Sequence, residues 1–406
     1  MTAAQPKRPH MLVLVAMTAL GPMTLNIIGP TMPGLQRLYD VSYSAAQSMV
    51  YMYLFAFATA QLFYGPLSDR YGRRTMTLIG LAIFMVGSAL TVWAATIETL
   101  AVGRALQAIG GCAGMALARA AIRDVYDRER SASMIGYVTM AMVVAPMLAS
   151  PLGGWMFEAQ GLRAVLLVPL VGGLLTFLLC LFGLHETLTQ RRHSPVRLGG
   201  IVAANFRILK TAGFRAYAMP AAFSATAYYI FVACSPYVSE TLLGVSPSGY
   251  GQWFLALSIA YMFGNGMTGR FSARIGGDRM IWVGFIAATI GLAIMTALAL
   301  LDMMTAAAMF LLMGFVSAGN GFSTPNAIAG AISADPSQAG AASGMTGFLQ
   351  MTMGAVGGIV CGYLLNATQE SLVLPVAMIA AALTAVYLFA AMRRSGPQSA
   401  TSSHSQ

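Results

Sequence analysis

Long apolar stretches alternate with short polar ones along almost the whole chain. A helix needs roughly 20 apolar residues to cross the hydrocarbon core of a bilayer. Ser44 and Gln47 have the spacing of a capping box, which predicts the start of the second stretch there. The pattern predicts an all-α membrane protein with twelve transmembrane helices, at residues 11–33, 43–67, 75–95, 98–124, 131–157, 162–184, 213–238, 248–271, 279–300, 303–332, 338–366 and 371–393.

One polar interval is longer and more basic than the others. It separates two runs of six spans, which predicts two pseudo-symmetric six-helix bundles. Secondary transporters built in this way carry their site between the halves, near the middle of the membrane. We therefore expect an N-terminal bundle at 1–188, a cytoplasmic linker at 189–212, a C-terminal bundle at 213–394 and a disordered Ser-rich tail at 395–406.

Charge is scarce and unevenly placed. Only 9% of residues are charged, against about 25% in an ordinary soluble domain. The net charge of +10 does not gather on one face, which argues against a nucleic-acid partner. Arginines concentrate in alternate loops and in the interval between the halves, whereas the opposite loops hold only Arg37 and Arg163. The positive-inside rule then places both termini in the cytoplasm, and we expect a monomer in the lipid bilayer of the inner (plasma) membrane.

The loop between the second and third spans carries an ordered motif, Gly65-Pro-Leu-Ser-Asp-Arg-Tyr-Gly-Arg-Arg74. Gly65 and Gly72 allow a tight turn and close helix contact. A degenerate copy follows the eighth span at 266–279, where a duplicated half would place it. Aspartate can pair with arginine, so we expect a cytoplasmic gate in which Arg119 and Arg123 pair with Asp69 or Asp124. The gate and coupling candidates are Asp69, Arg70, Arg73, Arg119, Arg123 and Asp124.

Two arginines, Arg104 and Arg119, lie inside apolar spans, and no acidic residue of the sequence lies deep in any span. A charge in hydrocarbon is expensive and usually functional. We predict that Arg104 lines a cleft, with snorkelling or a structural role as the alternative. A cleft of this kind would be neutral to positive and would favour neutral or weakly anionic cargo over cationic dyes.

The fifth span combines prolines with small residues. Pro146, Pro151, Gly153 and Gly154 lie within ten residues of one another. Such residues allow helices to bend and to approach closely. The alternative is that these residues serve packing alone.

Several of these motifs resemble those of one known family. The loop at 65–74 resembles the signature loop of the major facilitator superfamily. The stretches at 104–110 and 145–154 are similar to motifs of its drug:proton antiporters. Further stretches are similar to the bicyclomycin-resistance and chloramphenicol-efflux (Bcr/CflA) subfamily, namely 26–33, 231–247, 325–327 and 339–350. The resemblance covers residues 11–394. It implies the major facilitator fold and the export of drugs by alternating access in exchange for protons.

The sequence departs from that subfamily in the first span. The position that is usually Asp, before a conserved proline step, is Asn26 here. In the relatives this carboxylate is thought to bind protons and cationic cargo. An asparagine can hydrogen-bond cargo but cannot carry a proton.

We expect a central cleft lined from both halves. Polar candidates in the spans are Asn26, Gln61, Arg104, Gln107, Asn265, Asn320 and Gln350. Methionine and aromatic residues suit an adaptable apolar wall. Candidates for that wall are Tyr53, Tyr137, Met140, Tyr228, Tyr229 and Phe231.

These observations predict an exporter of small amphipathic drugs or metabolites, neutral or weakly anionic, that exchanges them for protons. The first alternative is an uncoupled facilitator or solute exchanger of the same fold, because Asn26 replaces the usual acid. The second is a non-transporting sensor or assembly partner. An enzyme is not expected, because the sequence has no phosphate-binding Gly-Lys-Ser/Thr loop and no metal-ligand or nucleophile–base motif. We expect no cofactor.

Overall fold

The computed structural model describes residues 8–126, 128–188, 198–334, 338–368 and 370–394, and every regular element within them is a helix. The first half of the chain forms α1 (Met11–Asn26), η1 (Gly29–Thr31), α2 (Met32–Tyr39), α3 (Tyr43–Tyr71), α4 (Arg73–Val92), α5 (Ile97–Val125), α6 (Arg128–Gln160) and α7 (Leu162–Gly183). The second half forms α8 (Leu198–Lys210), α9 (Ala212–Tyr237), the π-helix η2 (Val238–Leu242), α10 (Pro247–Ile275), α11 (Gly277–Leu300), α12 (Ala306–Ser333), α13 (Ala339–Thr368) and α14 (Val373–Arg394).

Ten helical segments of the described chain are long and apolar enough to cross a membrane, with Met11–Tyr39 counted as one. The two other predicted spans correspond to α3 and α10. Each is 29 residues long, so composition and not length sets them apart. Both helices make extensive contacts with the opposite half, α3 with α13 and α10 with α6. Both of these less apolar helices therefore lie at the interface between the halves.

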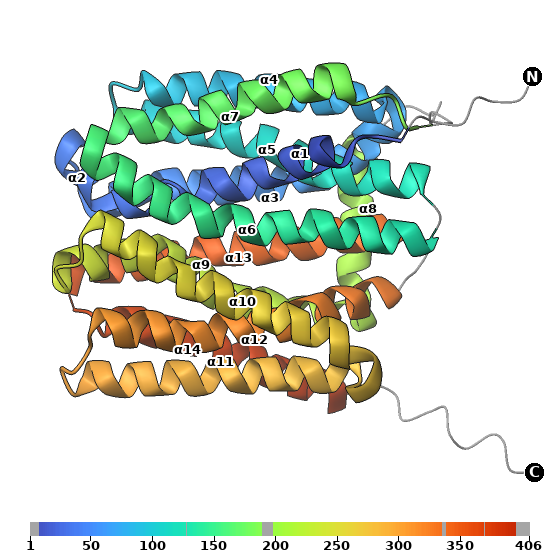
Figure 1. Cartoon of the computed structure of the whole chain (residues 1–406). Helices are drawn as coiled ribbons and strands as arrows, with labels where there is room; N and C mark the ends of the chain where they lie inside the picture. The colour runs from blue at the N-terminus through green and yellow to red at the C-terminus, as the bar shows by residue number, and fades with distance from the viewer. Residues whose placement is uncertain (1–7, 127, 189–197, 335–337, 369, 395–406) are drawn as a thin grey trace, which may run out of the picture.

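Two bundles lie side by side. Helices α1 to α7 pack chiefly against one another, and so do α9 to α14. Figure 1 shows the two groups as upper and lower layers, with α8 crossing between them at the end where both termini lie. The two-bundle fold is confirmed, whereas the boundaries at 188 and 212 stay predictions. Helix α8 falls inside the predicted linker, and the predicted tail at 395–406 lies outside the described residues.

The two halves share an unusual turn at one position. Gly72 joins α3 to α4 with φ 96° and ψ 148°, and Gly276 joins α10 to α11 with φ 92° and ψ 140°. This region of backbone space is accessible essentially only to glycine. The motif at 65–74 and its degenerate copy at 266–279 therefore form the same backbone turn, which supports the inference of an internal repeat.

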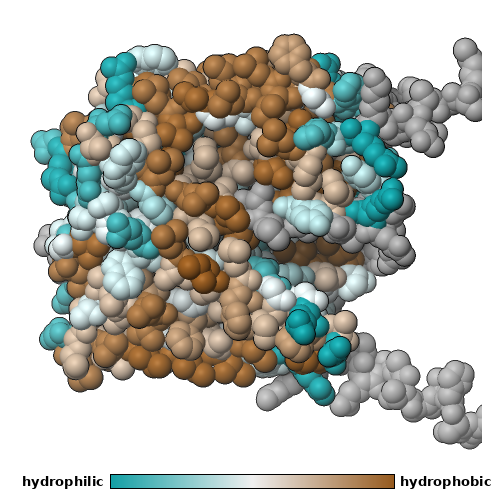
Figure 2. Space-filling view, in the orientation of Figure 1, coloured by the Kyte–Doolittle hydropathy of each residue, from teal (hydrophilic) through white to brown (hydrophobic). Residues whose placement is uncertain are grey.

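The surface has the character of a membrane protein. Figure 2 shows a mostly hydrophobic face between more polar ends. It also shows a hollow between the two bundles at the end that carries the termini. We call this the terminal end and the opposite one the distal end.

Candidate functional site

Hydrogen bonds join the two bundles at the distal end. The Tyr43 hydroxyl donates to Ala233 O at 2.9 Å, and the Tyr51 hydroxyl donates to Gly358 O at 2.7 Å. Gln47 Nε2 also donates to Ala233 O at 2.7 Å. All three donors lie on α3, and the acceptors lie on α9 and α13. These buried contacts hold the distal end closed.

Gln47 is thus not part of a helix cap, and the predicted capping box is wrong. The cap of α3 is Ser42, whose Oγ accepts from Ala45 N at 3.3 Å. The sequence spacing of Ser44 and Gln47 was suitable, but the Gln47 amide bonds an acceptor on the opposite bundle. A buried donor finds more stabilisation in such a partner than at an exposed helix start.

Charged groups reinforce the same end. Arg37 Nη2 lies 2.7 Å from Glu240 Oε1, which joins α2 to the π-helix η2. Ser248 N on α10 donates to Glu158 Oε1 on α6 at 2.9 Å. Each contact crosses between the bundles, so opening the distal end requires that both be broken.

The first span is interrupted beside this closure. Pro30 and Pro33 lack the backbone N–H that a helix requires, and the chain passes from α1 through the short η1 into α2. Asn26 is the last residue of α1 and is 5% exposed. Its Nδ2 donates to Pro22 O at 2.9 Å, while its Oδ1 is buried without a partner. The interrupted span thus ends α1 at a residue whose side-chain acceptor has no partner among the described residues.

A cavity of about 220 Å³ lies between the bundles and reaches this acceptor. Residues of both bundles line it, and none of its described lining residues is charged. The lining consists of Gly21, Pro22, Leu25, Asn26, Tyr53, Phe57, Met115, Met142, Val143, Pro146, Ala225, Tyr228, Tyr229, Phe254, Leu257, Ser258, Tyr261, Ser317, Asn320, Thr324, Gln350 and Met351. Its apolar wall with a few polar groups is typical of a small-molecule site.

Three of the lining residues carry buried polar atoms without a hydrogen-bond partner. Asn26 Oδ1 comes from the first bundle, and Ser317 Oγ and Gln350 Nε2 come from the second. A buried polar group that stays unpaired costs stability. The three side chains thus leave one acceptor, one donor and one hydroxyl unused beside the cavity.

Other predicted polar residues of the cleft are used within the protein. Asn320 lines the cavity, but its Oδ1 accepts from Ser224 Oγ at 2.8 Å. Gln61 Nε2 contacts the sulfur of Met351 at 3.4 Å, and Asn265 Nδ2 donates to Tyr261 O at 3.0 Å. These side chains fix helices in place.

The structure places Arg104 behind the cavity wall, although the sequence predicted it in the lining. The side chain is 1% exposed, and its Cζ lies 4.5 Å from the centre of the Tyr53 ring. Nη1 donates at 2.9 Å both to Thr24 O and to Gln107 Oε1, while Nε and Nη2 have no partner. The Tyr53 ring forms the wall in its place. Arg104 therefore neither snorkels nor meets cargo in this state.

Gln107 supports that arginine and is likewise fully buried. Its Nε2 donates to Ser88 Oγ at 3.0 Å, so its Oε1 is held toward Arg104. The pair links α1, α4 and α5. Its role in this structure is to bind helices together, not to line the site.

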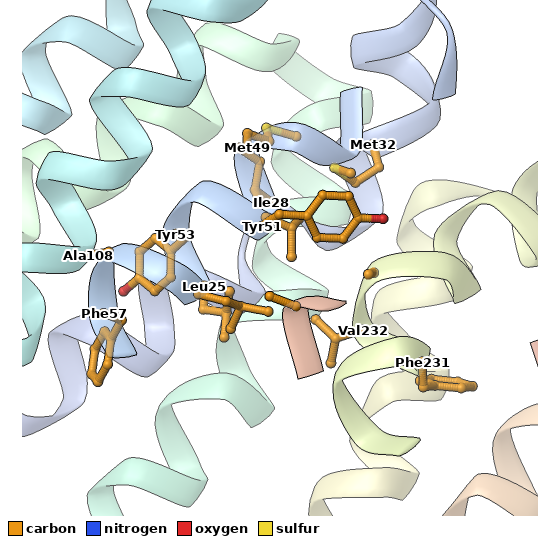
Figure 3. Close-up of a cluster of buried hydrophobic side chains, with 14 of the residues drawn as sticks. Leu25, Ile28, Met32, Met49, Tyr51, Tyr53, Phe57, Ala108, Phe231 and Val232 are labelled. Carbon is orange, nitrogen blue, oxygen red and sulfur yellow. The ribbon is translucent and has the colours of Figure 1, made fainter. Parts of the chain in front are cut away.

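The predicted apolar wall is only partly assembled. Tyr53, Tyr228 and Tyr229 line the cavity. Phe231 is fully buried against Phe310, with ring centres 5.5 Å apart, and in Figure 3 it points away from Tyr53. Tyr137 is 57% exposed and is not part of the lining. The side chain of Met140 lies outside the described residues.

The signature loop forms an ion-pair cluster around one arginine. Arg73 Nη1 lies 2.7 Å from Asp69 Oδ1, and Arg73 Nε lies 3.0 Å from Asp124 Oδ2. The Arg73 N–H also donates to Glu186 Oε1 at 2.9 Å. These contacts stay within the first bundle and tie the α3–α4 turn to α5. Arg70 instead lies over the ring of its neighbour Tyr71.

Among the described residues, the predicted pairing of Arg119 or Arg123 with Asp69 or Asp124 is therefore not formed. Arg73, the first residue of α4 after the Gly72 turn, lies within ion-pair distance of both carboxylates. Arg119 contacts the sulfur of Met142 at 3.3 Å. Arg123 is exposed one turn further along α5.

The glycines of α6 lie where helices touch. A Cβ at Gly153 would overlap Ile27 O, and one at Gly154 would overlap Pro247 O of the other bundle. Pro146 lines the cavity, and Pro151 lies close to Gly251 of α10. By contrast, a Cβ at Gly65 would meet open space, so no close helix contact requires glycine there.

Sequence reasoning missed part of the lining. Tyr261 and Ser317 come from spans eight and ten, and Met115 and Met142 from spans four and five. Apolar spans contain many such residues, so no local signal marks those that face the interior. Among the described residues, no group of His, Cys, Asp and Glu could hold a metal ion.

Comparisons with known proteins agree with this architecture. Residues 14–358 match the family model described as Major Facilitator Superfamily. The chain is 27% identical over 343 residues to multidrug resistance protein D of Escherichia coli, covering 84% of this chain and 85% of that protein. It is 25% identical over 348 residues to the bicyclomycin resistance protein homolog of Haemophilus influenzae, covering 86% and 87%. These matches confirm the resemblance inferred from the motifs.

The fold is also similar to a solved structure, that of a bacterial homolog of the human lysosomal transporter Spinster in an inward-facing and unoccupied conformation. The TM-score is 0.69, with 17% identity over 94% of this chain and 96% of that one. At this identity the likeness concerns the fold alone. It agrees with the all-α architecture predicted from the sequence.

Proposed function

The chain belongs to the Major Facilitator Superfamily, a family of membrane transporters and not of enzymes, and from this premise we propose that it exports small amphipathic drugs or metabolites. We place it in the inner membrane with both termini in the cytoplasm, as the distribution of arginines favours. The names of the two bacterial relatives, which concern resistance to drugs, support export of such compounds.

One observation, the uncharged cavity between the bundles, supports the choice of cargo. Its described lining includes Asn26, Ser317 and Gln350, whose buried polar atoms lack a partner in the described chain, and no carboxylate to balance a cation. Its volume of about 220 Å³ falls below the roughly 300 Å³ at which typical ligand pockets begin. The cargo is therefore small, with both hydrogen-bond donors and acceptors, and is neutral or weakly anionic.

Alternating access follows from the asymmetry of the two ends. Contacts of Arg37, Gln47 and Tyr51 close the distal end, and the interface is hollowed at the terminal end (Figure 2). Cargo enters from the terminal side and leaves when the bundles rock apart at the distal side. With the termini in the cytoplasm, this direction is export.

Exchange for protons is the drive that the family resemblance supports. An uncoupled facilitator or solute exchanger is the second candidate, because one observation favours it: no carboxylate belongs to the described cavity lining, where Asn26 stands in place of the acid usual in the subfamily that the motifs resemble. A non-transporting sensor is the third candidate, and no structural feature favours it.

Transport in proteoliposomes with an imposed pH gradient tests these candidates. Chloramphenicol movement that follows the gradient and stops with a protonophore supports exchange, whereas movement that ignores the gradient supports facilitation. A sensor would move nothing. In cells lacking other pumps, ethidium export without chloramphenicol export would contradict the proposed cargo class.

Asn26→Asp places a titratable group at the unpaired acceptor of α1. We expect the pH dependence of chloramphenicol transport to become steeper, because the new carboxylate can take up a proton in the cavity. The matched variant Asn205→Asp alters a buried amide in α8, outside the cavity. A pH profile unchanged by Asn26→Asp, or changed as much by the control, would refute a coupling role for this position.

A further inference from the structure

Arg119 is a half-buried cation for which the proposed mechanism so far has no use. It lies on α5, one turn beyond the cavity-lining residue Met115. Its one hydrogen bond among the described residues joins Nη2 to the sulfur of Met142 at 3.3 Å. A thioether is a weak acceptor, and within the described chain no carboxylate lies within ion-pair distance of this guanidinium. A half-buried cation inside a span is costly to keep and points to a function.

The surroundings of Arg119 belong to the cavity and to both bundles. Met142 of α6 lines the cavity, and so does Tyr261 of α10 in the second bundle, which lies close enough to interact with Arg119 electrostatically. Arg119 itself is not part of the lining. It therefore stands at the margin of the cavity, where the two bundles meet.

A second arginine extends this position toward solvent. Arg123 lies four residues further along α5, about 6 Å closer to the terminal end at 1.5 Å per residue. Exposure increases along the helix from the buried Met115 through the half-buried Arg119 to the exposed Arg123. Like charges at this spacing repel each other on a helix, and they are close enough here to do so. An anion between them would relieve the repulsion.

Arg104 does not compete for this role. It is enclosed by the Tyr53 ring, Thr24 and Gln107, and is 1% exposed. Asp69 and Asp124 do not neutralise Arg119, because both pair with Arg73. Among the described residues at this margin of the cavity, the positive charge left without a carboxylate is that of Arg119, with Arg123 beside it.

We propose that Arg119, assisted by Arg123, forms an anion-binding site at the terminal-end margin of the cavity, which takes the carboxylate of a monoanionic amphipathic molecule. The apolar part of that molecule lies against Met115 and Met142, inside the cavity. This inference rests on the proposed export function and adds to it the charge class that is captured first.

The test compares two probes of nearly the same shape, pyrenebutyrate and the neutral pyrenebutanol. Their affinities for the purified full chain in nanodiscs of zwitterionic lipid are measured by fluorescence anisotropy. A charge-assisted hydrogen bond is strong enough that we expect the wild type to bind pyrenebutyrate about tenfold more tightly. That preference decreases as salt is added. A wild type that binds both probes equally overturns the proposal without any variant.

Variants locate the effect. Arg119→Gln abolishes the preference by weakening pyrenebutyrate binding, while pyrenebutanol affinity changes by less than about twofold. Arg119→Lys keeps the charge and most of the preference, and it decides the question if Arg119→Gln does not fold. Arg163→Gln removes an exposed arginine at the start of α7, near the distal end, and serves as the matched control.

Two outcomes overturn the assignment of Arg119. One is an equal loss of affinity for both probes in Arg119→Gln, which would indicate a structural role for Arg119. The other is a preference that survives the substitution. Wild-type chloramphenicol export tests the proposed function independently, so a wild type that exports chloramphenicol but binds both probes equally refutes this inference alone.

Discussion

Removing the Tyr53 ring would uncover a buried cation, and the cost can be worked out from the structure. The Arg104 Cζ lies 4.5 Å from the ring centre, in a fully buried setting. A desolvated cation–π contact contributes about 2 kcal/mol. The Tyr53 hydroxyl donates to Gly21 O at 2.9 Å, and such a neutral hydrogen bond contributes about 1 kcal/mol.

Two substitutions separate these contributions. Tyr53→Phe keeps the ring and loses only the hydroxyl, so we expect the free energy of unfolding to decrease by about 1 kcal/mol. Tyr53→Leu loses both, and we expect a decrease of about 3 kcal/mol. Unfolding by SDS in mixed micelles, followed by far-UV circular dichroism, measures both values on the purified protein.

A double-mutant cycle with Arg104→Met isolates the contact between ring and guanidinium. We expect a coupling energy of about 2 kcal/mol between Tyr53→Leu and Arg104→Met. Equal destabilisation by Tyr53→Phe and Tyr53→Leu, or a coupling energy near zero, would refute the reasoning. The ring would then act only as part of the cavity wall.

Two further predictions concern the closure of the distal end, and both use labelling of Cys234 by a membrane-impermeant thiol reagent, mapped by mass spectrometry. Glu240→Gln weakens the pair with the largely exposed Arg37, so we expect labelling to accelerate about twofold, as about 0.5 kcal/mol implies; unchanged labelling contradicts this. Gly154→Ala inserts a Cβ that overlaps the backbone of α10, so we expect Cys234 labelling to accelerate more than in Glu240→Gln. The control Gly269→Ala on α10 places its Cβ in open space and should be labelled at the wild-type rate. Equal rates for the two glycine variants would contradict the packing argument.

Much of the fold could be predicted from the alternation of apolar and polar stretches. Hydrophobicity along the chain is set by the membrane, so the spans correspond to helices whose ends lie within several residues of the prediction. Asn26, Asn320 and Gln350, predicted to face the cleft, do line the cavity. Polar side chains within a span must face protein or water, which restricts their direction.

The errors arose where two side chains compete for one partner. In sequence Arg73 and Arg119 are both plausible partners for Asp124, and in the folded chain Arg73 pairs with it from the start of α4, after the Gly72 turn. Arg104 was expected in the lining because nothing in the sequence indicates that the Tyr53 ring covers it. Such outcomes depend on distances between helices that are remote in the chain.

The limited apolar character of α3 and α10 affects how the chain is inserted into the membrane during synthesis. A segment that does not partition into lipid by itself enters the membrane together with a neighbour that shelters it. Helix α10 is synthesised after its partner α6, whereas α3 precedes α13 by most of the chain and depends first on α5 within its own bundle. The two bundles are therefore unequal during synthesis, because α10 emerges when its partner in the other bundle is already made, whereas α3 must wait for α13.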